Sequence, residues 1–301
     1  MTDPNVTQKA KTLACFVEIL LLICELTVGN HLCTHLSAYL TPKPRNGEPM
    51  IIAKCAMYSI FQVLLIFILT YSMAWNFCTR PSVIFNKMGL SRSTCKVSWK
   101  MIAIVTSCHI VSTYLLDYLQ NHYFLSAMKV VQLDAKRLSD PYAVIRIIVF
   151  APLIEEIVCR GFIFLILIKY VSNSNRFRLI VISSFIFALI HLSNLFQSAN
   201  TVSDEYLVLQ IVYGFIVSIF YGTRMMCNDL CIVECIILHV FNNLISLFAM
   251  PPFRSVDVWQ NPIAVFGAIQ SIFSKVLQFL ILVKIEFKNL IVFFKMYEYF
   301  F

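Results

Sequence analysis

The chain has 301 residues, of which 59% are hydrophobic and 13% charged, and its mean hydropathy is +0.78. A soluble domain is excluded, because soluble proteins are normally only about half apolar. The formal net charge of +8 is spread over the ends of apolar runs instead of forming one basic patch, which argues against a nucleic acid partner. We therefore expect an integral, multi-pass membrane protein.

Apolar runs, taken in chain order, predict helices that cross the bilayer, since about 20 apolar residues span its hydrocarbon core. The predicted spans cover residues 13–33, 56–76, 101–119, 144–171, 179–196, 206–222, 231–250 and 264–283. The aromatic tail 285–301 carries Lys288 and Lys295 and is expected to lie on the membrane surface. The predicted fold class is all-α, a polytopic membrane helical bundle of about eight transmembrane helices.

The charges of the loops predict the orientation of the bundle. The second and fourth loops are basic, whereas the fifth carries Asp204 and Glu205 and no basic residue. Basic loops face the cytoplasm, so both termini are predicted to be cytoplasmic, in a bacterial plasma membrane or the endoplasmic reticulum. The chain divides into N-terminal spans (1–143), a core rich in unusual polar residues (144–250), and a last span with its tail (251–301).

The eleven cysteines lie mostly inside or beside apolar runs. A cysteine in such surroundings behaves as a small apolar residue. The odd count and the lack of a CxxC pair argue against a disulfide framework.

The fourth span contains charged residues in the stretch APLIEEIVCRGFIF, residues 151–164. Ionisable residues within a span cost about 2.5–3.5 kcal/mol each on insertion scales, so they usually face the bundle interior and serve a function. Glu156 and Arg160 are four residues apart and are expected to pair on one helix face. Glu155 points about 100° away and is left to face another partner. For this run alone, a buried structural ion-pair cluster is the alternative.

Two later spans add polar residues at a similar depth. His191 lies in the apolar run FIFALIHLSN, while His239 and Asn243 are four apart and share one helix face. Counted from the cytoplasmic ends at 1.5 Å per residue, Glu155, His191, His239 and Asn243 lie roughly 24, 18, 12 and 18 Å deep. Three helices thus place polar groups in one slab of the membrane.

These residues are sufficient for water-mediated cleavage of an amide bond. A carboxylate in apolar surroundings can act as a general base on a water that a nearby histidine shares. A second histidine and an asparagine amide can donate hydrogen bonds to the developing oxyanion. This chemistry requires no serine or cysteine nucleophile.

At these positions the chain resembles the CaaX protease and bacteriocin-processing family (CPBP, or Abi) of intramembrane endopeptidases. The family pattern is EExxxR on one helix, FxxxH on a later one and HxxxN on a third. Here the pattern is matched, in order, by Glu155, Glu156 and Arg160, by Phe187 and His191, and by His239 and Asn243. The resemblance covers about residues 150–250, which makes 144–250 the expected catalytic core.

The resemblance implies a role for each matched residue. Glu155 and His191 would activate the attacking water, and His239 and Asn243 would stabilise the oxyanion. Glu156 and Arg160 would orient and hold the site, with Phe187 as a further supporting residue. The implied substrate is a peptide or lipidated protein at the bilayer, either a prenylated CaaX protein or another membrane-associated peptide. No cofactor is expected.

Three alternatives stay open at this point. A zinc-dependent membrane protease could use the same Glu and His residues, although an HExxH motif is absent and Asn is a poor zinc ligand. A transporter or channel could use intramembrane Glu, His and Arg as an ion relay. A non-proteolytic immunity or scaffold protein could keep the fold without the activity.

Overall fold

A computed structural model describes residues 4–40, 51–90, 97–123, 141–171, 176–192 and 204–249, and every regular element in these ranges is helical. The N-terminal part contains α1 (Pro4–Leu40), α2 (Ile51–Asn76), the short α3 (Pro81–Lys87) and α4 (Trp99–Tyr123). The C-terminal part contains α9 (Arg176–Ile190), α11 (Asp204–Cys227) and α12 (Ile232–Ala249). The predicted all-α class is confirmed for these residues.

Between the two parts runs one long helix that alternates between α and π geometry. Its segments are α6 (Pro141–Ile145), η1 (Arg146–Phe150), α7 (Ala151–Glu156), η2 (Ile157–Ile163) and α8 (Phe164–Tyr170). A π segment changes the direction of the side chains that follow it, and such segments are frequent at functional sites. The two π segments flank the pair Glu155–Glu156.

Seven of the eight predicted spans coincide with helices among the described residues, while the span 264–283 and the tail 285–301 lie outside them. Two stretches, Ala10–Leu40 and Ala53–Asn76, are long and apolar enough to cross a membrane. The full number of membrane crossings and their orientation stay predictions.

The expected extent of the fifth span was wrong at its end. Helix α9 ends at Ile190, so His191 lies in the turn that follows and not in the middle of a helix. The sequence after Ile190 is His-Leu-Ser-Asn, and such short polar side chains compete with the backbone for hydrogen bonds. The apolar residues on either side of this stretch had suggested that the helix continued.

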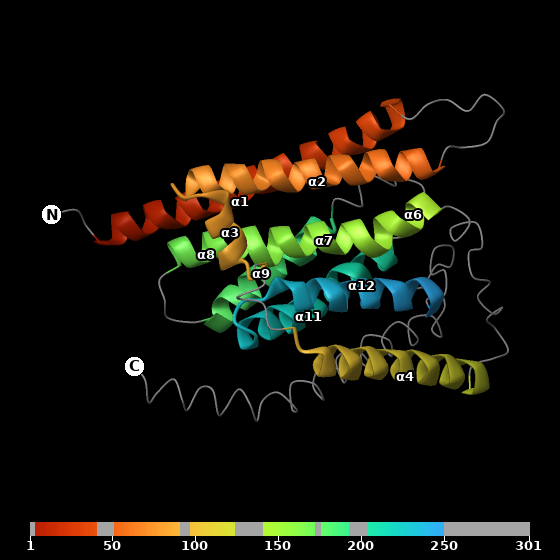
Figure 1. Ribbon diagram of the computed structural model, residues 1–301. Coiled ribbons are helices and arrows are strands. Elements are labelled where there is room, and N and C mark those ends of the chain that lie inside the picture. Colours follow the sequence, from red (N-terminus) through yellow and green to blue (C-terminus); the bar gives the residue numbers. More distant parts are fainter. Residues whose placement is uncertain are drawn as a thin grey trace.

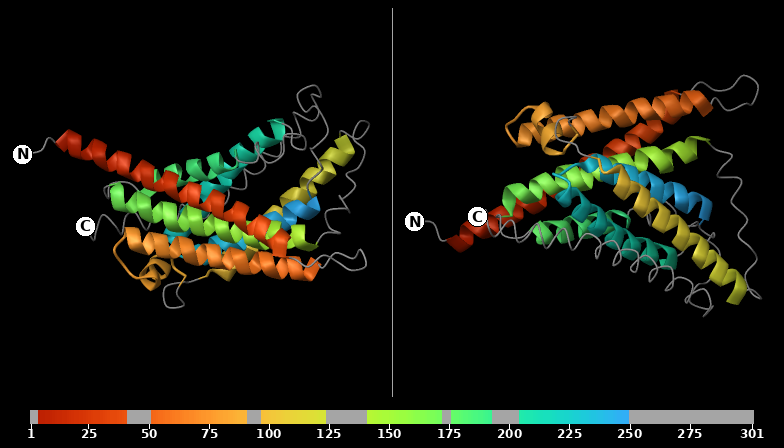
Figure 2. Two further views of the ribbon diagram at one scale, coloured as in Figure 1. Left: turned by 90° about the horizontal axis from the view of Figure 1, so that it is seen from above. Right: turned by 60° about the horizontal axis from the view of Figure 1, so that its bottom comes forward.

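The long central helix lies between two groups of helices (Figure 1). Helices α1 and α2 pair with each other and contact α8 and α6, whereas α9 and α12 pack on the other side. Helix α11 packs against α9, and α4 packs against α12; Figure 2 shows the same arrangement from two further directions. Every residue of Ile157–Ile163 is buried. Arg160, the charged residue of this segment, therefore faces protein and not lipid.

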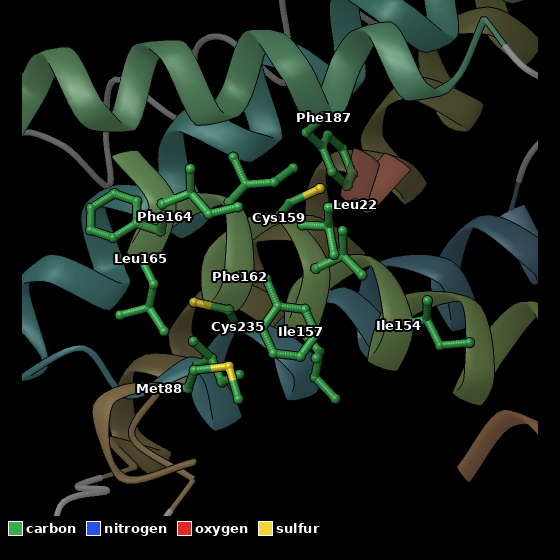
Figure 3. Packing of buried hydrophobic residues seen from close by; sticks show 14 of the residues in the cluster. Leu22, Met88, Ile154, Ile157, Cys159, Phe162, Phe164, Leu165, Phe187 and Cys235 are labelled. Carbon is green, nitrogen blue, oxygen red and sulfur yellow. The ribbon is translucent and has the colours of Figure 1, made fainter. Parts of the chain in front are cut away.

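Around η2, the core brings together side chains of α1, α9 and α12 with those of the central helix (Figure 3). Phe162 and Ile163 are fully buried there, and Met88 from the end of α3 packs against the same turn. Gly161 permits this contact, because a Cβ at that position would lie 2.4 Å from the Sδ of Met88. The end of α3 is thereby fixed to the central helix.

A buried ion pair joins α11, α12 and the start of α4. Nε of Arg224 donates to Oε1 of Glu234 at 2.8 Å, and Nδ2 of Asn228 donates to Oε2 at 2.7 Å. The backbone N–H of Ser98 also donates to Oε2, at 2.9 Å. Both oxygens of this carboxylate are thus hydrogen-bonded, and three segments depend on it.

We predict that Glu234→Ala lowers the free energy of unfolding by about 3–5 kcal/mol, because it leaves Arg224 buried without its counter-ion. Glu234→Gln keeps the shape and one acceptor oxygen and should lose less. Thermal unfolding of both variants in detergent measures the difference. If Glu234→Ala melted at the same temperature as the wild type, this ion pair would not be what holds the three segments together.

One cysteine departs from the expected behaviour. Cys231, between α11 and α12, is disulfide-bonded, whereas the other cysteines of the described residues form no disulfide. A disulfide needs only two Cα atoms about 4.4–6.8 Å apart, a proximity that neither the odd cysteine count nor the missing CxxC pair reveals.

Candidate active site

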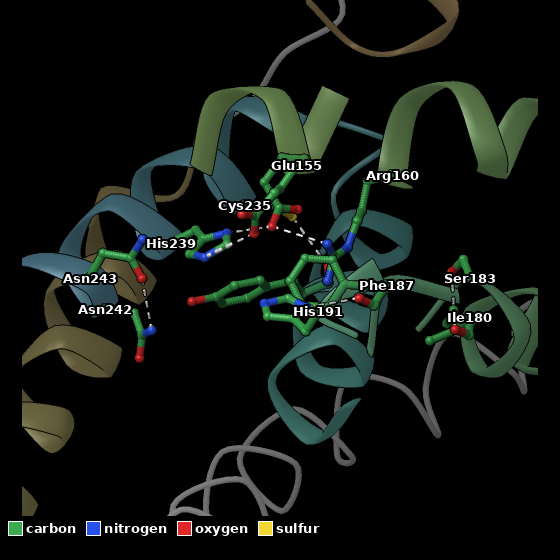
Figure 4. Close-up of polar contacts among 12 residues, drawn as sticks. Glu155, Arg160, Ile180, Ser183, Phe187, His191, Cys235, His239, Asn242 and Asn243 are labelled. Carbon is green, nitrogen blue, oxygen red and sulfur yellow. Dashed lines mark hydrogen bonds and ion pairs between the residues drawn. The ribbon is translucent and has the colours of Figure 1, made fainter. Parts of the chain in front are cut away.

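Glu156 is the centre of the polar cluster. Its side chain is 0% exposed, and its Oε1 accepts hydrogen bonds from Nη1 of Arg160 at 3.1 Å and from Nδ1 of His239 at 2.8 Å. The predicted pairing of Glu156 with Arg160 is confirmed. Because a carboxylate paired with arginine only accepts, Nδ1 is the protonated nitrogen of His239 in this contact. Figure 4 shows the imidazole of His239 beside Glu155.

Glu155 has a different environment from its neighbour. Its side chain is 30% exposed, and its Oε2 lies 3.8 Å from Nε2 of His239, which is too long for a hydrogen bond. The imidazole of His239 therefore lies between two carboxylates, one on each ring nitrogen. Of the two adjacent glutamates, Glu156 is buried and neutralised, whereas Glu155 is accessible and has no hydrogen bond among the described residues.

Aromatic rings from α9 and α11 cover the charged groups. The guanidinium carbon of Arg160 lies 4.3 Å from the centre of the Phe187 ring and 5.7 Å from that of Tyr221. The ring of His239 packs against the same two aromatics, at 6.1 and 5.6 Å. Cation–π contact stabilises a desolvated guanidinium, so Phe187 supports the charge of Arg160 as well as filling space.

His191 approaches the cluster from the turn after α9. Its Nδ1 lies 3.0 Å from the carbonyl oxygen of Phe187 and donates to it, and the two rings are 4.8 Å apart. This bond leaves Nε2 as an acceptor when the ring is neutral. Phe187 contacts both His191 and His239. In the described part of the chain, no direct hydrogen bond joins His191 to Glu155.

Asn243 is tied to the helix that carries the glutamates. Its Nδ2 donates to the carbonyl oxygen of Ile147 at 3.0 Å, and its Oδ1 accepts from Nδ2 of Asn242 at 3.4 Å. Oδ1 of Asn242 in turn accepts from the hydroxyl of Tyr213 on α11. Asn242, Tyr213 and Tyr221 were missed from the sequence. The adjacent pair Asn242–Asn243 in an apolar run was the one available signal.

The residues expected from the sequence are thus brought together to different degrees. Glu155, Glu156, Arg160 and His239 form one contiguous group, Phe187 and His191 border it, and Asn243 is anchored to η1 of the same central helix. No group of three or more His, Cys, Asp or Glu side chains with the arrangement of a metal site occurs within the described ranges.

The helical bundle and its internal carboxylate–histidine cluster define a class of protein: an integral membrane protein with a polar site enclosed by its helices. Residues 137–245 match the family model described as type II CAAX prenyl endopeptidase Rce1-like, which includes every residue of the site. This segment is about a third of the chain, and the match supports a relationship with the CaaX protease family. Comparisons with curated proteins and with solved structures gave no match.

Proposed function

We propose that this protein is an intramembrane endopeptidase that uses Glu155 to activate water and cleaves a membrane-associated substrate of the prenylated CaaX class. The observation that carries the proposal is the difference between the adjacent glutamates. Glu156 is committed to Arg160 and His239, whereas Glu155 is partly exposed and available to a water molecule. A general base must have this freedom to reach its proton.

In the proposed reaction, Glu155 removes a proton from water, and His191 accepts the second hydrogen bond of that water through Nε2. The hydroxide attacks the carbonyl carbon of the scissile peptide bond. Glu155 then returns the proton to the leaving nitrogen, the C–N bond breaks, and the products are a carboxylate and an amine.

The oxyanion formed on attack is assigned to His239 and Asn243. Because the Nδ1 proton of His239 is donated to Glu156, His239 stabilises an oxyanion through Nε2 only in its doubly protonated form. Glu156 then keeps that imidazolium in place beside the site. Preorganised donors of this kind typically contribute about 10²–10³ in kcat each.

A mechanism without metal fits the charges of the cluster. The guanidinium of Arg160 occupies Oε1 of Glu156 and would repel a divalent cation at the same carboxylate. Nδ1 of His239 is likewise engaged. The zinc-dependent alternative would require both contacts to break.

The cytoplasmic orientation of both termini is part of the proposal. Helix α3, which contains Lys87, and the end of α8, which contains Lys169, lie at one end of the bundle (Figure 1). Basic residues concentrated at one end favour a cytoplasmic position for that end.

We expect the purified full chain in detergent or nanodiscs to cleave a prenylated CaaX peptide, and to cleave the same peptide much more slowly when it lacks the prenyl chain. Mass spectrometry of the products identifies the bond that is broken. Equal rates on both peptides would show that the enzyme does not recognise the prenyl chain, and would rule out the prenylated class of substrate. No cleavage by well-folded wild-type protein of prenylated peptides varied in their last three residues would favour the non-proteolytic alternative.

A further inference from the structure

The carbonyl group that anchors Asn243 is available because of the local geometry of the central helix. In the π segment η1, the N–H of Ala151 bonds to the carbonyl of Arg146, five residues earlier. In the same register the carbonyl of Ile147 would require the N–H of residue 152, which is a proline and has none. The side-chain amide of Asn243 supplies the missing donor at 3.0 Å.

The oxygen of the Asn243 amide is held by a hydrogen-bonded chain that begins on α11. The hydroxyl of Tyr213 donates to Asn242, and the amide of Asn242 donates to Oδ1 of Asn243. A chain of three side chains thus ends on the carbonyl of Ile147. Since a carbonyl only accepts, this chain sets which end of the Asn243 amide carries the nitrogen.

We infer that Tyr213, Asn242 and Pro152 are positioning residues that hold the amide of Asn243 in register with Glu155. The inference rests on the proposed function, in which Asn243 donates to the oxyanion. Its Nδ2 carries two protons, and the bond to Ile147 uses one of them. The other has no acceptor in the described part of the chain and remains for a substrate oxygen.

The hydrogen bond from Asn243 to the carbonyl of Ile147 couples the position of the oxyanion donor to the position of the base, Glu155. Ile147 and Glu155 belong to one continuous helix, eight residues apart, whereas Asn243 lies on α12. A bond between α12 and the carbonyl of Ile147 therefore fixes the distance between the oxyanion donor and the base. Errors of about 1 Å in such a distance cost of the order of 10² in rate.

Two substitutions test the inference from opposite directions. Tyr213→Phe removes the hydroxyl at the start of the chain. Pro152→Ala restores a backbone N–H that competes with Asn243 for the carbonyl of Ile147. Each is expected to lower kcat on the prenylated peptide about tenfold, less than the loss of a whole oxyanion donor, with KM changed less than twofold.

Stability separates positioning from a merely structural role. Pro152→Ala should keep or raise the melting temperature while kcat falls, because it adds a helix hydrogen bond. Tyr58→Phe is the control for Tyr213→Phe, since Tyr58 lies on α2, where its ring packs against Tyr142 and Phe150, and it is not part of the hydrogen-bonded chain that ends on Ile147. The Tyr58→Phe variant should cleave the prenylated peptide at the wild-type rate.

A double-mutant cycle completes the test. In an Asn243→Ala background, Tyr213→Phe and Pro152→Ala should cause no further loss of kcat, because the group that they position is gone. Full additivity, or wild-type kcat in both single variants, would overturn the inference. These results all require an active wild type; an inactive wild type would instead contradict the proposed function.

Discussion

Glu155→Gln is expected to lower kcat by about 10³-fold or more, with the melting temperature unchanged. The amide has the same shape as the carboxylate but cannot take a proton from water, and general base catalysis contributes about 10²–10⁴ in rate. Glu155 is partly exposed and has no hydrogen bond in the described residues, so its loss should leave the fold intact. Cleavage of the prenylated peptide and thermal unfolding, measured on the same preparation, give both quantities.

A matched control is available on α1. Glu25 also lies within a predicted span, where its carboxylate accepts from Ser72 at 3.2 Å, far from the cluster in sequence. Glu25→Gln should cleave at the wild-type rate. If Glu155→Gln retained a tenth or more of wild-type kcat, Glu155 would not be the base.

Glu156→Ala is expected to show the second largest effect, on stability as well as activity. It leaves Arg160 buried without its counter-ion, and breaking a buried pair in this way costs about 3–5 kcal/mol. It also removes the acceptor that holds Nδ1 of His239, so the imidazole loses its orientation. We expect kcat to fall by about 10²–10³, as for the loss of an oxyanion donor.

The double variant Glu156→Ala/Arg160→Met separates these two effects. Removing both charges eliminates the uncompensated guanidinium and should recover most of the lost melting temperature. Activity should stay low, since His239 still lacks its acceptor. Recovery of cleavage together with stability would mean that Glu156 acts only by neutralising Arg160.

The part of the site that lies on one helix was predictable from the sequence. Residues four apart on a helix share a face, so the pairing of Glu156 with Arg160 followed from spacing alone. The same rule left Glu155 without an intrahelical partner. Apolar runs likewise located seven helices of the described residues, with errors mainly at their ends.

The contacts between helices were not predictable in this way. Spacing places His239 on a face of α12, but it does not say that the ring lies between two consecutive glutamates. The π segments depend on packing and on Pro152, and they change the register that a regular helix would give. The role of Tyr213 depends on α11 lying beside α12, which no local pattern specifies.

The most direct test of the account is cleavage of the prenylated peptide by wild-type protein that has been stripped with a strong zinc chelator, with stripped Glu155→Gln measured in parallel. We predict that the stripped wild type retains its full rate and that Glu155→Gln yields no product above background. Loss of wild-type activity on chelation, with recovery on adding zinc, would contradict the account and establish a metal-dependent protease.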